Sequence, residues 1–184
     1  MGILNVTPDS FFDGGKYKDE KSMLQHVEKM LLEGADIIDI GACSTRPNAP
    51  LILEEEELNR LIPALKLIRK QFPDTIISAD TFRSGVAERA VQAGADMVND
   101  ISGGTLDKKM FETIGKLKIP YVLTHIKGSP QTMQADPQYK DVVKEVKHYL
   151  GEKIHALKKD MIFVMQNLRM ILVKRLHITI VLQN

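Results

Sequence analysis

The chain has 184 residues, 43% of them hydrophobic and 27% charged, which suffices for one core and predicts about one domain. Its formal net charge of +1 excludes a general electrostatic attraction to nucleic acid or acidic membranes. The single cysteine, Cys43, excludes a disulfide framework and a cysteine-rich zinc site, and it fits a reducing cytoplasm. We expect no signal peptide and no membrane span, because a strand starts near residue 1 and no apolar run reaches about 20 residues.

Five short apolar runs predict the buried strands of a parallel sheet: Ile3–Val6, Asp36–Gly41, Thr75–Asp80, Asp96–Ile101 and Pro120–His125. The segments between them show helical periodicity, and Pro63 in the second of these predicts a bend or a shifted helix start. Two Gly-Ala-Asp sequences, at Gly34 and Gly94, are each expected to end a helix just before the next strand. This alternation predicts an α/β protein, either a doubly wound sheet or a (β/α)8 TIM barrel.

Polar side chains gather at the ends of these predicted strands and in the loops just beyond. They are Asn5, Asp39, Ser44-Thr45-Arg46-Pro47, Asp80-Thr81, Asn99-Asp100, His125 and Lys127. In both candidate folds the carboxyl ends of parallel strands form the ligand site. The convergence of amide, carboxylate, hydroxyl and cationic groups therefore predicts a site for a small polar ligand.

Each of these residues also has a purely structural interpretation. Asp80 and Asn99 can cap the helices that follow them, and Asp100 and Ser102 are better candidates for capping. Arg46 can be a solvated surface charge, and His125 can be a hydrogen-bonded core histidine. Cys43 is interpreted as a small filler of the core, because nothing nearby in the sequence would activate its thiol.

Several motifs resemble, in the same order, those of dihydropteroate synthases. They are residues 1–15, residues 36–47 (Asp-Ile-Ile-Asp-Ile-Gly-Ala-Cys-Ser-Thr-Arg-Pro), and residues 77–81, 98–104 and 125–134. The resemblance runs from residue 1 to about residue 155 and implies a TIM barrel. It implies an enzyme of folate biosynthesis that joins 4-aminobenzoate to (7,8-dihydropterin-6-yl)methyl diphosphate, giving 7,8-dihydropteroate and diphosphate.

The resemblance also implies roles for individual residues. Asn5 would contact the Mg²⁺ that accompanies the diphosphate. Thr45, Asp80 and Asn99 would contact the pterin, and Arg46 and Pro47, with the Thr7–Gly15 loop, would form the aminobenzoate side. The implied partners are small-molecule substrates, without nucleic acid or membrane. The family is commonly a homodimer, but we find no counterpart of its late helices in this sequence.

The sequence supplies only about five βα units, so we expect an incomplete barrel in residues 1–160. Residues 161–184 form an atypical apolar tail without Gly, Pro, Asp or Glu, and we hypothesise a reading-frame slip near residue 160. We assign no counterpart to the family's active-site lysine or to its anion-binding Arg/His motif, so the catalytic residues remain unassigned. An incomplete barrel leaves two exposed parallel edges, so the chain as written is predicted to be poorly stable, and without those motifs it is predicted to be essentially inactive.

Two other functions are compatible with these motifs. One is a non-catalytic pterin-binding fragment. The other is a barrel like the methyltetrahydrofolate:corrinoid methyltransferases, which also place Asp and Asn pterin contacts at strand ends. Residues 5–11, Asn-Val-Thr-Pro-Asp-Ser-Phe, argue against the second alternative, because those enzymes do not need this loop.

Overall fold

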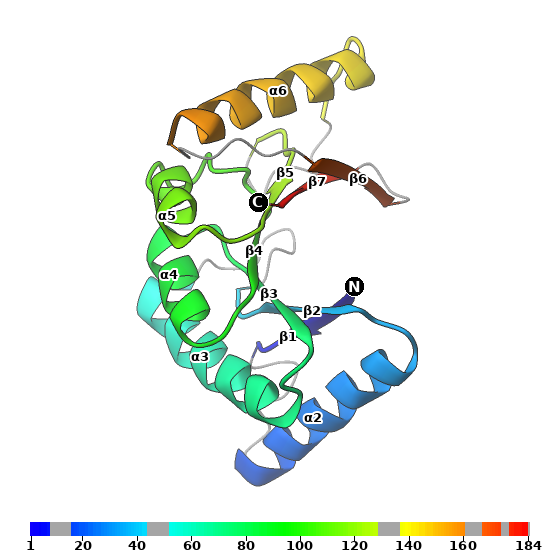
Figure 1. Ribbon diagram of the computed structural model, residues 1–184, viewed down its shortest axis with the longest axis vertical. Coiled ribbons are helices and arrows are strands. Elements are labelled where there is room, and N and C mark those ends of the chain that lie inside the picture. Colours follow the sequence, from blue (N-terminus) through cyan, green and yellow to red (C-terminus); the bar gives the residue numbers. More distant parts are fainter. Residues whose placement is uncertain (8–15, 44–51, 129–136, 161–166, 174–176, 184) are drawn as a thin grey trace. The chain divides into compact units, whose positions relative to one another are not determined.

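The computed structural model describes residues 1–7, 16–43, 52–128, 137–160, 167–173 and 177–183 (Figure 1). Two compact units divide the chain, and each is described by itself. The first contains the strands β1 (Gly2–Asn5), β2 (Ile37–Gly41) and β3 (Ile76–Asp80), with the helices α2 (Lys16–Leu32), α3 (Glu54–Gln71) and most of α4 (Ser84–Gln92). The second contains most of β4 (Met97–Asp100), together with α5 (Met110–Leu117), β5 (Tyr121–Thr124) and α6 (Val142–Asp160), followed by β6 (Asn167–Val173) and β7 (His177–Gln183).

Strands and helices alternate through five consecutive βα pairs, from β1 and α2 to β5 and α6. This order confirms the predicted α/β class and the five predicted units. All five predicted strands are present, and each end lies within one residue of its expected position. Of the bend or shifted helix start predicted at Pro63, the shifted start is wrong, because α3 runs from Glu54 to Gln71 with Pro63 inside it. Pro63 is exposed, so the helical hydrogen bond that it cannot make faces solvent.

The core of the first unit lies between the sheet and its helices. β1 pairs with β2 and β2 with β3, all in parallel, and one face of the three strands carries fully buried side chains. They pack with the apolar stripes of α2, α3 and α4, and the cluster includes Leu4, Ile38, Ile40, Ile77, Val27, Leu61, Leu65 and Val86. On the opposite face, Ile3 is 64% exposed and Ile76 is 44% exposed. The helix-facing side of this sheet is therefore apolar and packed, while its other side carries these two apolar residues together with the polar side chains of Asn5, Asp39, Ser78 and Asp80.

The repeated Gly-Ala-Asp sequence has the predicted structural role. Gly34 and Gly94 have φ angles of 96° and 110°, in the left-handed region that favours glycine. In both copies the glycine N–H and the following alanine N–H donate back to the last helical turn, as in a Schellman motif. The repeat therefore ends a helix and directs the chain into the next strand.

Arg69, in the last turn of α3, is the centre of a polar network in the first unit. Its guanidinium donates to three carbonyl oxygens, those of Pro73 (2.7 Å), Thr75 (2.8 Å) and Gly94 (2.8 and 3.1 Å). It also pairs with the carboxylate of Asp96, which in turn accepts the N–H of Ile77 at 2.7 Å. This network, which we call the Arg69 clamp, joins the end of α3 to the start of β3 and to the turn before β4.

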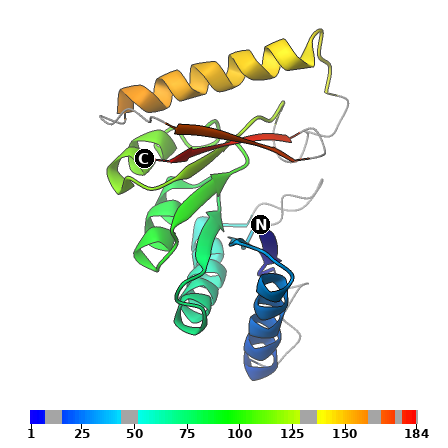
Figure 2. The ribbon, with the colours of Figure 1, turned by 45° about the vertical axis from the view of Figure 1, so that its right-hand side comes forward.

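In the second unit, β4 pairs with β5 in parallel, and β5 pairs with β7 in antiparallel orientation. β6 and β7 form an antiparallel hairpin with seven residue pairs, from Asn167 opposite Gln183 to Val173 opposite His177. Figure 2 shows this hairpin, in brown and red, beside β5. The apolar tail of the sequence thus contributes two strands, and β7 occupies the edge of β5 that would otherwise be open.

Candidate functional site

The candidate site in the first unit is built on three strand ends that lie in register. Asn5 at the end of β1 is opposite Gly41 at the end of β2, and Gly41 is opposite Asp80 at the end of β3. A Cβ atom placed on Gly41 would lie 3.1 Å from Oδ2 of Asp80 and 3.6 Å from Oδ1 of Asn5. Both side chains therefore turn toward the open position above Gly41.

This arrangement suits the recognition of a polar ligand. Asn5 is exposed and Asp80 is half-buried, so both remain accessible to solvent, while the backbone between them is buried. The glycine at position 41 leaves room for the Asp80 carboxylate, because the Cβ atom of any other residue would lie close to Oδ2 of Asp80. The pair offers an amide and a carboxylate, which can accept hydrogen bonds from a ligand or contact a hard cation.

Two residues of α3 support these strand ends, and sequence reasoning did not identify either of them. The Thr81 hydroxyl, directly after β3, donates to Oε1 of Glu57 at 2.6 Å. Arg60 donates to the carbonyl of Ala42, directly after β2, at 3.5 Å. A signal was present in the sequence, because Glu57 lies four residues before Leu61 and so falls on the apolar stripe of α3.

The end of β4 in the second unit carries Asn99 and Asp100. Asn99 is half-buried and lies opposite Val122 of β5. Asp100 is fully buried and accepts hydrogen bonds from Ser102 N–H (2.7 Å), Gly104 N–H (2.9 Å) and the Tyr121 hydroxyl (2.6 Å). Asp100 therefore orders the Ser-Gly-Gly turn that follows β4 and does not cap a helix, since α5 begins only at Met110.

Burial raises the pKa of Asp100, and the hydrogen bonds from Tyr121, Ser102 and Gly104 oppose that shift. Because the folded pKa lies above the unfolded value, the contribution of Asp100 to stability is complete at low pH and is lost as pH rises through the folded pKa. Burial also raises the pKa of Tyr121 well above its usual range, and the charge of Asp100 adds to this rise. The phenol therefore remains a hydrogen-bond donor.

Replacing Tyr121 with Phe removes the hydroxyl that stabilises the ionised Asp100. We expect the free energy of unfolding to fall by about 1.5–3 kcal/mol at pH 7, because the lost hydrogen bond is to a charged group. The loss should be smaller near pH 4, where Asp100 binds a proton more readily. Urea unfolding at both pH values measures the difference. Tyr139→Phe is the matched control, and equal losses at both pH values would contradict this role of Tyr121.

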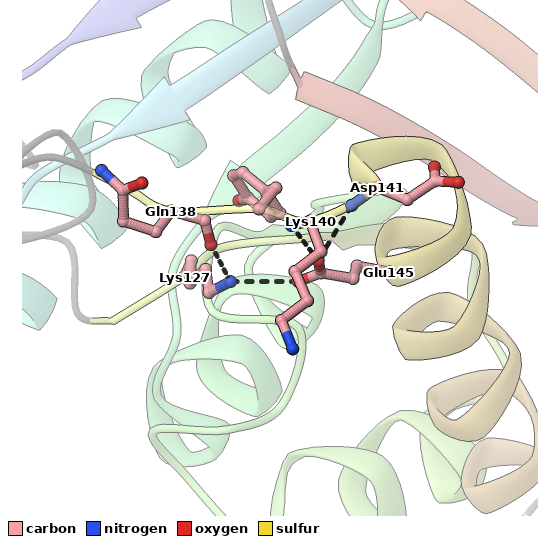
Figure 3. Close-up of a pocket in the computed structure, with 6 residues that line it drawn as sticks. Lys127, Gln138, Lys140, Asp141 and Glu145 are labelled. Atoms are coloured by element: carbon pink, nitrogen blue, oxygen red, sulfur yellow. Dashed lines mark hydrogen bonds and ion pairs between the residues drawn. The ribbon is translucent and has the colours of Figure 1, made fainter.

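The polar residues after β5 line a separate cavity of about 590 Å³ in the second unit (Figure 3). Lys127 donates to the carbonyl of Gln138 and to Oε2 of Glu145 at 3.0 Å. The hydrogen bond from Lys127 is the main cause of a lowered pKa for Glu145. The ring of His125 packs edge-on against Tyr149, with ring centroids 4.8 Å apart. Lys127 and His125 are thus held by neighbours within the second unit.

The structure describes only part of the predicted site. Asn5 and Asp80 share one position in the first unit, and Asn99 lies at the end of β4 in the second. Thr45, Arg46 and Pro47 lie outside the described residues, as does the loop from residue 8 to residue 15. Among the described residues, no group of three or more His, Cys, Asp or Glu side chains could hold a metal ion.

Two further observations bear on the sequence predictions. No helix in the described part of the chain is long and apolar enough to span a membrane. The tail contains one Arg-x-His sequence, Arg175-Leu176-His177, to which we assigned no role. Arg175 lies outside the described residues, and His177 begins β7.

Comparison with known proteins finds similar dihydropteroate synthases. The dihydropteroate synthase of Synechocystis is 45% identical over 154 residues, which cover 84% of this chain and 53% of that protein. The crystal structure of Xanthomonas albilineans dihydropteroate synthase with 4-aminobenzoic acid is similar, with a TM-score of 0.77 and 40% identity, over 87% of this chain and 56% of that chain. The Burkholderia cenocepacia enzyme complexed with 7,8-dihydropteroate gives a TM-score of 0.72 and 37% identity, over 87% of this chain and 53% of that chain.

This chain therefore spans about half the length of these relatives. The likeness confirms the predicted resemblance to dihydropteroate synthases and the predicted class of an incomplete (β/α)8 barrel. The pterin binding enzyme family matches residues 1–163. Because that match covers most of the 184 residues of this chain, the chain belongs to the pterin binding enzyme family.

Proposed function

We propose that this chain is the pterin-binding part of a dihydropteroate synthase. That enzyme joins 4-aminobenzoate to (7,8-dihydropterin-6-yl)methyl diphosphate in folate biosynthesis. The observation that carries the proposal is the convergence of Asn5 and Asp80 on the open position above Gly41. The ligands of the similar Xanthomonas and Burkholderia structures, 4-aminobenzoic acid and 7,8-dihydropteroate, support the substrate class.

The chemistry of the pterin edge fits the carboxylate of Asp80. A pterin presents a row of amide-like donors and acceptors, and an ionised carboxylate accepts hydrogen bonds from two neighbouring N–H groups. Asn99 can both donate and accept, and it remains a predicted pterin contact together with Thr45. Arg46 and Pro47 remain the predicted aminobenzoate side.

Asn5 is the residue proposed to hold Mg²⁺. Its amide oxygen is exposed at a strand end, and Mg²⁺ is often bound by one or two protein oxygens together with substrate phosphates and waters. When bound, the cation would supply positive charge beside the diphosphate.

The proposed reaction needs no covalent protein nucleophile. The arylamine nitrogen forms a bond to the methylene carbon of the pterin, the bond from that carbon to the diphosphate oxygen breaks, and the amine loses a proton. Catalysis then depends on positioning the amine and stabilising the leaving charge. The buried position of Cys43 agrees with its interpretation as a core filler and not as a nucleophile.

We infer that the 184-residue chain binds a pterin without turnover, because no residue is assigned to the roles of the family's lysine and Arg/His pair. Homodimer formation and a cytoplasmic location remain predictions from the family and from the single cysteine. The methyltransferase alternative is less well supported, because the relatives described above are dihydropteroate synthases.

The test is calorimetric titration of the purified chain with 6-hydroxymethylpterin and its diphosphate, and with methyltetrahydrofolate as the competing ligand. We expect saturable binding of both pterins, tighter binding of the diphosphate when Mg²⁺ is present, and no dihydropteroate on adding 4-aminobenzoate. Asn5→Ala should remove the Mg²⁺ effect and leave binding of 6-hydroxymethylpterin unchanged. A preference for methyltetrahydrofolate, or no pterin binding, would overturn the proposal, and dihydropteroate formation would overturn the inference of binding without turnover.

A further inference from the structure

Glu57 differs from the glutamates that precede it in α3. The helix begins with Glu54, Glu55 and Glu56, which are exposed and suited to the positive end of the helix dipole. Glu57 follows them but is 0% exposed. Because burying a carboxylate is unfavourable unless it is well hydrogen-bonded, its position needs a specific partner.

Thr81 supplies one such hydrogen bond. Its hydroxyl donates to Oε1 of Glu57 over 2.6 Å, and Thr81 itself is only 2% exposed. Short hydrogen bonds from a hydroxyl to a carboxylate are about twice as strong as neutral ones. Since Thr81 directly follows Asp80, this bond fixes the backbone at the point where the candidate pterin contact leaves β3.

The next turn of α3 supports the neighbouring strand end. Arg60 pairs with Glu56 on the helix surface and donates to the carbonyl of Ala42 over 3.5 Å. Ala42 directly follows Gly41, the position toward which Asn5 and Asp80 turn. The first turns of α3 therefore contact the residues that follow two of the three strand ends of the site, those of β2 and β3.

We propose that Glu57 is a positioning residue for the pterin site, acting through the Thr81 hydroxyl on Asp80. This inference rests on the proposed function, because it gives a reason for fixing Asp80. The hydrogen bonds between a carboxylate and a flat ring edge depend on the direction of the carboxylate. In enzymes, a displacement of about 1 Å in a positioned group can lower the reaction rate by up to about 100-fold.

The experiment measures the affinity of folded protein for 6-hydroxymethylpterin, with the free energy of unfolding measured in parallel. Thr81→Val keeps the shape of the side chain but removes the donor, and it should weaken binding about tenfold. Thr81→Ser restores the donor and should bind within about threefold of the wild type. Glu57→Gln should weaken binding, and the double variant Glu57→Gln/Thr81→Val should lose less affinity than the two single losses combined, because the two residues share one hydrogen bond.

Two control variants make the same chemical changes elsewhere. Thr113→Val alters a half-buried threonine of α5, and Glu55→Gln alters an exposed glutamate of the same helix turn as Glu57. Both should bind the pterin as the wild type does. If Thr81→Val and Glu57→Gln are less stable but bind the pterin normally, Glu57 has only a structural role and the inference is wrong. Failure of the wild type itself to bind would instead overturn the proposed function and this inference with it.

Discussion

Replacing Asp80 with Asn is expected to weaken pterin binding by about 100-fold or more. The change keeps the shape of the side chain but exchanges one acceptor oxygen for an NH₂ group, which would face the N–H donors of the pterin. Each hydrogen bond to a charged group contributes about 1.5–3 kcal/mol, and about 1.4 kcal/mol corresponds to a tenfold change in affinity. Titration with 6-hydroxymethylpterin measures the loss.

Asp74→Asn is the matched control, because Asp74 is exposed in the turn before β3 and the same atoms change. It should leave pterin affinity unaltered. Gly41→Ala is a second variant of the site, since its methyl group would lie 3.1 Å from Oδ2 of Asp80 and would displace the carboxylate. If Asp80→Asn binds as tightly as the wild type, Asp80 does not contact the pterin and the site is placed wrongly.

Replacing Arg69 with Met should lower the free energy of unfolding by about 3 kcal/mol, because several hydrogen bonds of a charged group are lost together. The methionine keeps much of the apolar stem but leaves the carbonyls of Pro73, Thr75 and Gly94 without their shared donor. Asp96 also loses its cationic partner. The ion pair alone would contribute little, since about half of Asp96 is exposed, so the expected effect rests mainly on the backbone carbonyls.

Chemical denaturation of both proteins measures this change. Lys70→Met is the control, because Lys70 is exposed beside Arg69 in the last turn of α3 and should cost less than about 0.5 kcal/mol. Folded Arg69→Met should bind the pterin as the wild type does. Equal stabilities for the two variants would show that the Arg69 clamp contributes nothing measurable.

The fold was predictable where local signals and tertiary packing agree. Short apolar runs such as Asp36–Gly41 could be recognised as strands, because a strand of a parallel sheet needs few polar residues. The repeated glycine at positions 34 and 94 marked helix ends, because it supplies the positive φ angles that close those turns. Pro63 misled the prediction of a helix start. The free-energy cost of a proline inside a helix depends on whether the lost hydrogen bond faces solvent, and the periodicity of the sequence alone does not reveal this.

The candidate site was predictable only in part. Asn5 and Asp80 could be identified because each is a polar residue at or next to the end of a predicted strand. The role of Gly41 could not be deduced, because it depends on which residues face it across two strands. Glu57 was overlooked because a run of four glutamates suggests a solvated helix start, and its hydrogen bond to Thr81 joins residues 24 positions apart. The pairing of β7 with β5 likewise depends on contacts between distant residues.

The Arg69 clamp and the carboxylate of Asp80 act on opposite ends of β3. The clamp holds the amide of Ile77, three residues before Asp80, and a strand rises by about 3.3 Å per residue, so about 10 Å of backbone separates them. Energetic effects at such a distance usually add without coupling. Substitutions at the amino end of β3 can therefore change the free energy of unfolding without changing which ligand binds. Substitutions at its carboxyl end can change which ligand binds without changing the free energy of unfolding.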